Sequence, residues 1–126
     1  MSDEQESAGG DTGTTETMME LDQEQLTALE PKMRLAMTAR GQGNDVEAKK
    51  LFDEILKEEP RLAEPRLELA HMAALTEDWE EAQGQARLAV EILKRGGQWT
   101  QDVAPEVLLG FALNLLGELV ARSSTA

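Results

Sequence analysis

The chain has 126 residues and a formal net charge of −13, with 25 acidic side chains, 12 basic side chains and no cysteine. Its length suits one domain. The acidic balance opposes binding to nucleic acid, where Lys and Arg must contact phosphates, and it equally opposes binding to anionic membrane surfaces. Without cysteine there is no disulfide framework, thiolate nucleophile or Cys-based zinc site.

Residues 1–20 differ in composition from the rest of the chain. They hold six Asp and Glu side chains, no Lys or Arg, and no bulky apolar residue between Met1 and Met18. Such a segment buries too little apolar area to offset its ordering entropy, so we expect a disordered acidic tail. It has no basic region followed by an apolar run, the pattern of a secretory signal. The longest apolar stretch of the chain, 107–120, is shorter than the about 20 residues that a transmembrane helix needs. We expect a cytoplasmic protein without membrane insertion.

Residues 21–126 are predicted to form one all-α domain. Strand signals are nearly absent, and apolar residues recur with a period near that of a helix. One apolar stripe predicts a helix over about 45–58, and another predicts a helix over 79–93 that Gly96 and Gly97 close. The first stripe consists of Ala48, Leu51, Phe52, Ile55 and Leu56.

A short extra helix is expected before these two. It covers 21–29 and is capped by Asp22. We expect it to be interrupted near Glu30, because Pro31 disfavours helical geometry at the residue before it.

The chain is similar to itself at a spacing of 34 residues. This shift maps Leu35 to Leu69, Ala36 to Ala70, Ala39 to Ala73, Glu47 to Glu81 and Ala48 to Ala82. Thirty-four residues is the period of the tetratricopeptide repeat (TPR), and the chain resembles that family over 29–62 and 63–96. It departs from the family at Lys32 and Arg66, where Trp is frequent. The resemblance implies antiparallel helical hairpins stacked as a short right-handed superhelix.

A third copy of the repeat begins but has only its first helix. Leu109, Gly110, Leu113 and Gly117 repeat the spacing of the first copy at an offset of 74 residues, so the linker around 96–102 is longer by six. The helix is predicted over 104–121, with Pro105 in its first turn.

The resemblance also implies a concave groove lined by the first helix of each hairpin. The residues carried over to the groove are Met33, Met37, Arg40, Glu64, Leu67, His71, Ala74, Leu75, Val107, Phe111, Asn114 and Leu115. A largely apolar lining that contains methionine suits an apolar segment of a partner protein. Alternatively, some of these residues simply pack on the N-terminal helix.

No chemistry beyond binding is indicated by the polar residues. Met33, Met37 and Glu68 occupy positions where the carboxylate clamp of the family needs cations and amides. His71, Glu64 and Glu68 together provide fewer ligands than the four that a structural zinc site needs. No nucleophile, base and orienting group can be assembled, so we expect neither an enzyme nor a cofactor.

The last helix is apolar almost all round, and an all-round apolar helix is normally buried. We predict a homodimer through Leu108, Leu109, Leu113, Leu116 and Val120. The N-terminal helix or the client protein could cover this helix instead. The predicted function is that of an adaptor or small chaperone that binds an apolar segment of a partner protein. The alternative is an obligate regulatory or assembly subunit of an enzyme or secretion complex.

Overall fold

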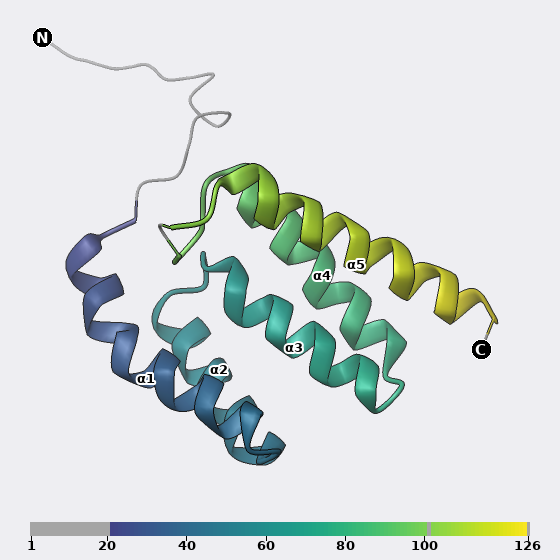
Figure 1. Cartoon of the computed structure of the whole chain (residues 1–126), viewed down its shortest axis with the longest axis horizontal. Coiled ribbons are helices and arrows are strands. Elements are labelled where there is room, and N and C mark those ends of the chain that lie inside the picture. The colour runs from purple at the N-terminus through teal and green to yellow at the C-terminus, as the bar shows by residue number, and fades with distance from the viewer. Residues whose placement is uncertain (1–20, 101, 126) are drawn as a thin grey trace, which may run out of the picture.

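The computed structural model describes residues 21–100 and 102–125, and the acidic tail predicted over 1–20 lies outside them. The described part is all helical, as predicted (Figure 1). Its helices are α1 (Gln23–Gly41), α2 (Asp45–Glu58), α3 (Ala63–Leu75), α4 (Trp79–Lys94) and α5 (Pro105–Thr125). The helices expected over 45–58 and 79–93 are confirmed nearly to the residue, because their ends are marked by local signals.

Helix α1 corrects the prediction of a short helix over 21–29. Asp22 caps it as expected, since its side chain accepts a hydrogen bond from the Glu24 amide at 3.0 Å. The helix does not stop before Pro31 but continues for 19 residues. Pro31 lies on the exposed side, where water can satisfy the carbonyl that has lost its amide partner. The flanking Leu29 and Met33 are buried and hold both halves of the helix in place.

The turns within the two hairpins have the same construction, 34 residues apart. Asn44 and Asp78 precede α2 and α4, and each side chain accepts a hydrogen bond from the amide three residues later. The residue before each cap has a positive φ, which is 79° at Gly43 and 61° at Glu77. The sequence repeat is therefore also a repeat of backbone conformation.

The helices follow one another across the molecule in chain order, with α1 and α5 at its two opposite sides (Figure 1). Helix α1 packs on α2, α3 on α4, and α4 on α5, whereas the contact between α2 and α3 is the smallest of the four. The first hairpin has its own core, built around Phe52 and Ile55 and extended by Leu69 and Met72 of α3. The cores between α3, α4 and α5 consist mainly of small residues, including Ala63, Ala70, Ala82, Ala86, Ala89 and Ala112.

Candidate protein-binding groove

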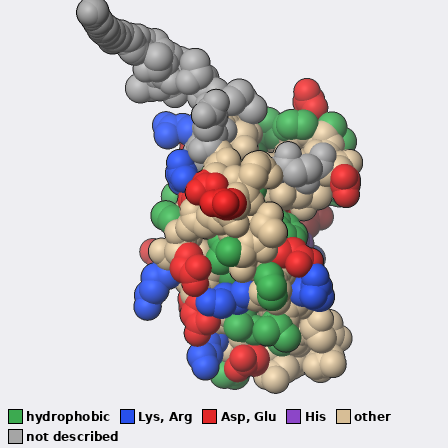
Figure 2. Space-filling model, turned by 90° about the vertical axis from the view of Figure 1, so that its left-hand side faces the viewer, with side chains coloured by type: hydrophobic (Ala, Val, Ile, Leu, Met, Phe, Trp, Pro, Cys, Tyr) green, Lys and Arg blue, Asp and Glu red, His purple; other side chains and the backbone are tan. Residues whose placement is uncertain are grey.

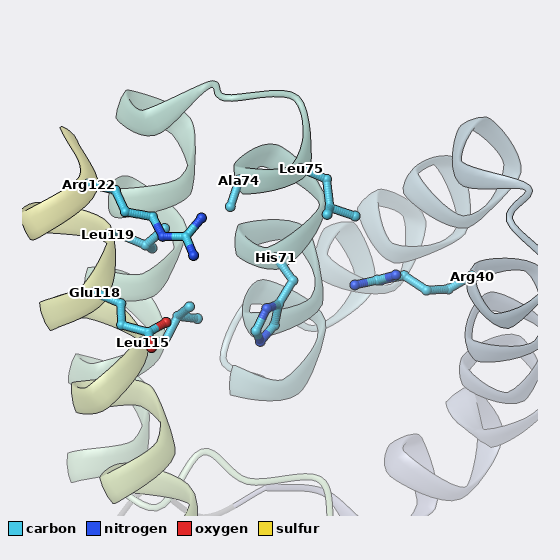
Figure 3. A pocket seen from close by; sticks show the side chains of 8 residues that line it. All are labelled: Arg40, His71, Ala74, Leu75, Leu115, Glu118, Leu119 and Arg122. Atoms are coloured by element: carbon cyan, nitrogen blue, oxygen red, sulfur yellow. The ribbon is translucent and has the colours of Figure 1, made fainter. Parts of the chain in front are cut away.

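A groove runs between α3 and α5, and α1 contributes to one end of it (Figure 3). It consists of two adjoining hollows of about 210 and 290 Å³ that share His71, Leu115 and Glu118. We call this feature the α3–α5 groove. The side chains that line it are Arg40, Leu67, Glu68, His71, Ala74, Leu75, Leu108, Phe111, Asn114, Leu115, Glu118, Leu119 and Arg122.

Most of the predicted groove residues meet there. Eight of the twelve predicted residues line the two hollows, namely Arg40, Leu67, His71, Ala74, Leu75, Phe111, Asn114 and Leu115. Val107 is exposed on α5 but does not contribute to either hollow. The spacing along α3 and α5 was thus sufficient to place these residues on a common face.

The two methionines do not line the groove. Met33 is only 5% exposed and belongs to the core between α1 and α2. It follows Leu29 by four residues and precedes Ala36 by three, so it lies on the stripe of α1 that faces α2. Met37 is partly exposed on α1 but lies outside both hollows. The prediction of a methionine-lined groove is therefore wrong for Met33, and the apolar lining comes from leucine and phenylalanine.

The apolar part of the groove is open to solvent. Phe111 is 65% exposed and Leu75 is 69% exposed, which is unusual for large apolar side chains that lie on one concave surface. Leu67 and Leu115 are partly buried beneath them and pack on the cores of α3, α4 and α5. An apolar side chain entering the groove would shield these surfaces from water, and this burial is the main source of binding free energy it offers.

Charged side chains lie at the α1 end and along α5. Arg40 and Glu68 form an ion pair with 3.1 Å between Nε and Oε1, which joins α1 to α3. Figure 3 shows His71, Glu118 and Arg122 pointing into the space between α3 and α5. Among the described residues no group of three His, Cys, Asp or Glu side chains converges on a possible metal position. The groove therefore offers an apolar floor with polar groups of both signs at its edges.

Glu64, a predicted groove residue, has a different role. Its carboxylate accepts hydrogen bonds from the backbone amides of Trp99 and Thr100, at 2.9 and 2.8 Å. These amides belong to the loop between α4 and α5, and we call its described residues, 95–100 and 102–104, the linker loop. Both carboxylate oxygens of Glu64 thus bind backbone amides of the linker loop, because this loop lies against the start of α3.

The linker loop also contacts the first hairpin, which sequence reasoning missed. The Trp99 indole packs on the core of α1 and α2, and its Nε1 donates a hydrogen bond to the Leu26 carbonyl at 3.2 Å. The Gly97 carbonyl accepts a hydrogen bond from the Ala63 amide at 3.0 Å. The available signal was the extra length of the linker together with its tryptophan. A longer linker can return across the row of helices to a distant neighbour.

Helix α5 packs on α4 along one side, which corrects the predicted self-association surface. Ala112 and Leu119 are buried, and three of the five predicted contact residues, Leu108, Leu109 and Leu116, pack on the same cores. Only Leu113 and Val120 remain exposed on the outer side. The helix is more exposed than its composition suggested, because α4 covers only one side of it.

The apolar part of α5 is longer than the stretch considered in the sequence. Over Pro105–Ser124 the helix has the length and composition of a membrane span, and it is the one such helix among the described residues. A helix buried in a protein core passes the same test, but only 17% of the window is buried in this protein. Packing of Ala112 and Leu119 on α4 explains part of this apolar character within the protein.

The surface at the α1 side of the molecule is mixed in charge. Figure 2 shows Lys and Arg side chains interspersed with Asp and Glu, with apolar patches between them. Such mixing is typical of a solvated protein surface.

No protein-family model matches the chain, and comparison with curated proteins and with solved structures finds no similar protein.

Proposed function

We propose that this protein is a short TPR-like array that binds an apolar segment of another protein in the α3–α5 groove, as an adaptor or small chaperone in the cytoplasm. The observation that carries the proposal is the exposure of Phe111 and Leu75 on one hollowed surface. The residue repeat at 34 and the matching turns at Gly43 and Glu77 support a repeat architecture.

The groove favours a ligand with apolar side chains on one side only. Leu67 and Leu115 form its floor, while Asn114 and Glu118 stand at its α5 edge. An amphipathic helix or an extended peptide can place its apolar side on this floor and leave its polar side in water. The described residues near the groove include both Arg40 and Glu68, which already pair with each other, so apolar contact is expected to contribute most of the affinity.

We further propose that α5 acts as a protein-packed helix rather than a membrane span. Glu106, Glu118 and Arg122 all lie within the apolar window, and each charged side chain opposes insertion into hydrocarbon. Fractionation of cells that express the full chain tests this point. Recovery in the membrane fraction after a carbonate wash would contradict it.

The binding role is tested by site-specific photocrosslinking in the native host. A photoreactive amino acid replaces Leu75 in the groove or, as the control, Leu35, which is also large, apolar and well exposed on α1 but lies outside the groove. We expect a defined protein to be crosslinked from position 75 and not from position 35. Equal labelling from both positions, or none from position 75, would contradict the assignment of the groove.

A second arm uses substitutions in the purified full chain with the crosslinked protein as ligand. Phe111→Glu places a charge beside the apolar floor and should weaken binding by at least about tenfold, which corresponds to the loss of one aromatic contact that the ligand would bury. Leu35→Glu changes the charge equally and should leave binding unchanged. If the chain is instead an obligate subunit, it will be insoluble or unfolded when expressed alone.

A further inference from the structure

The outer side of α5, away from α4, carries alternating large and small apolar residues. Gly110, Leu113, Gly117 and Val120 follow one another at intervals of three and four residues, so they form one stripe of the helix. Leu113 is 48% exposed and Val120 is 40% exposed. A Cβ atom at either glycine would meet no atom within 4 Å. We call this stripe the outer seam.

Comparison with α3 shows which neighbour the outer seam lacks. Helix α3 is covered on two sides, by the first hairpin at Leu69 and Met72 and by α4 at Ala70. At a spacing of 40 residues Met72 corresponds to Ala112, which is likewise buried against the preceding helix, α4. Ala70 corresponds to Gly110, which is exposed. The outer seam is therefore the side on which α3 carries its paired helix.

We propose that the outer seam pairs with the same seam of a second copy of this chain, with the two α5 helices antiparallel. In one register each Leu113 lies opposite Gly117 of the second copy, and each Val120 lies opposite Gly110 of the second copy. Every large side chain then meets a glycine, so the two helices can approach closely and interdigitate. The contact is the same on both chains, as a two-fold axis requires.

The parallel arrangement of the same helices is disfavoured by shape and by charge. It places Leu113 beside Leu113 and Gly117 beside Gly117, which leaves gaps at the level of the glycines. It also places the two Glu106 side chains together, and like charges at a helix interface are repulsive. In the antiparallel register Glu106 lies opposite Ser124 of the second copy. Charge and packing thus favour the same orientation.

The pairing leaves both binding grooves accessible. Phe111 lines the α3–α5 groove and lies on the opposite side of α5 from Leu113, because two residues turn through about 200° of an α-helix. Asn114 lies at the border between the groove and the outer seam. A dimer would therefore present two grooves and could hold two segments of one partner or one partner assembly. The dimer does not depend on the proposed binding function, since the outer seam and the groove share no residue.

The oligomeric state of the full-length protein tests the proposal, measured by sedimentation velocity over a dilution series. We expect the wild-type chain to sediment as a dimer. Gly117→Gln adds a side chain at the seam and should weaken dimerisation by at least about tenfold, because this side chain fills the space that Leu113 of the second copy would occupy. Gly84→Gln is the matched control, since Gly84 is also an exposed helical glycine with no atom near its Cβ direction. It should leave the dimer unchanged.

The register is tested by disulfide formation, which is clean because the chain has no cysteine. A mixture of Leu113→Cys and Gly117→Cys chains should form the mixed disulfide faster than either chain forms its own, because only the mixed pair faces directly. A monomeric wild type, a dimer that survives Gly117→Gln, or faster like-with-like crosslinking overturns the proposal. A monomer would leave a helix of another protein or residues 1–20 as the occupant of the seam.

Discussion

Trp99 donates a hydrogen bond from its indole Nε1 to the backbone carbonyl of Leu26, 73 residues earlier in the chain. The two residues belong to the linker loop and to the first half of α1. Because the direct contact between α2 and α3 is small, this bond and the indole packing around it form a second attachment of the first hairpin. The linker loop therefore contributes to holding the hairpins in one array.

Replacing Trp99 tests this attachment. Trp99→Ala should lower the free energy of unfolding by about 2–3 kcal/mol, below the usual value for a fully buried tryptophan because Trp99 is only partly buried. Trp99→Phe keeps most of the packing and should lower it by about 1 kcal/mol through loss of the hydrogen bond. Urea unfolding followed by circular dichroism measures both. Equal stability of the alanine variant and the wild type would show that Trp99 does not stabilise the attachment of the first hairpin.

Glu64 is expected to order the linker loop through the two amides it accepts. Glu64→Ala leaves the Trp99 and Thr100 amides without their acceptor and should cost about 1–3 kcal/mol. Glu64→Gln retains one oxygen and should cost less. Amide hydrogen exchange should accelerate at Thr100 in the alanine variant, whereas amides in the middle of α4 should exchange as in the wild type. Unchanged exchange at Thr100 would contradict the contact.

Gly97 is expected to tolerate no side chain. A Cβ there would lie 2.3 Å from the Arg61 carbonyl oxygen and 2.3 Å from Cγ2 of Ile92, so the backbone of two loops would have to move. Gly97→Ala should destabilise the protein by about 1–3 kcal/mol. Gly84→Ala is the control, because its Cβ meets nothing and alanine is the better helix former, by up to about 1 kcal/mol. Thermal unfolding should shift in opposite directions for the two variants.

The left-handed backbone at Glu77 predicts a stabilising substitution. Its φ of 61° is close to that of Gly43 at the same place in the first hairpin, yet only glycine adopts this region without strain. Glu77→Gly should raise the free energy of unfolding by about 1 kcal/mol. Gly43→Ala introduces the strain in the first hairpin and should lower it by a similar amount. A loss of stability in Glu77→Gly would show that the glutamate side chain contributes more than the strain.

The buried Glu59 carboxylate predicts a loss of stability in acid. Hydrogen bonds from the Arg61 side chain, at 2.8 and 2.9 Å, are the main cause of a Glu59 pKa below its ordinary value of 4.5. A lowered pKa in the folded state stabilises the protein fully above pH 4.5, and this contribution disappears as the pH falls through the folded pKa. Glu59→Gln should be about 2 kcal/mol less stable at neutral pH and should lose less on acidification than the wild type. Parallel acid slopes in urea titrations at pH 6 and about pH 3 would contradict this.

Much of the groove could be predicted from the sequence because its residues recur along single helices. His71 and Leu75 are four residues apart on α3, as are Phe111 and Leu115 on α5, so each pair shares one side of its helix whatever the packing. Met33 could not be placed in this way. Its position depended on whether Pro31 interrupts α1, and the answer comes from the burial of Leu29 and Met33 against α2.

The amino-acid sequence by itself determined helices α2, α4 and α5, the Asp22 cap and the repeat at 34 residues, because periodicity and capping act over a few neighbouring residues. Only the tertiary structure decided that the linker loop returns to Leu26, that Glu64 serves this loop rather than the groove, and that α4 covers one side of α5 while the outer seam stays exposed. These outcomes depend on distances between segments far apart in the chain. Local patterns carry no record of such distances, since many arrangements bury the same stripes equally well.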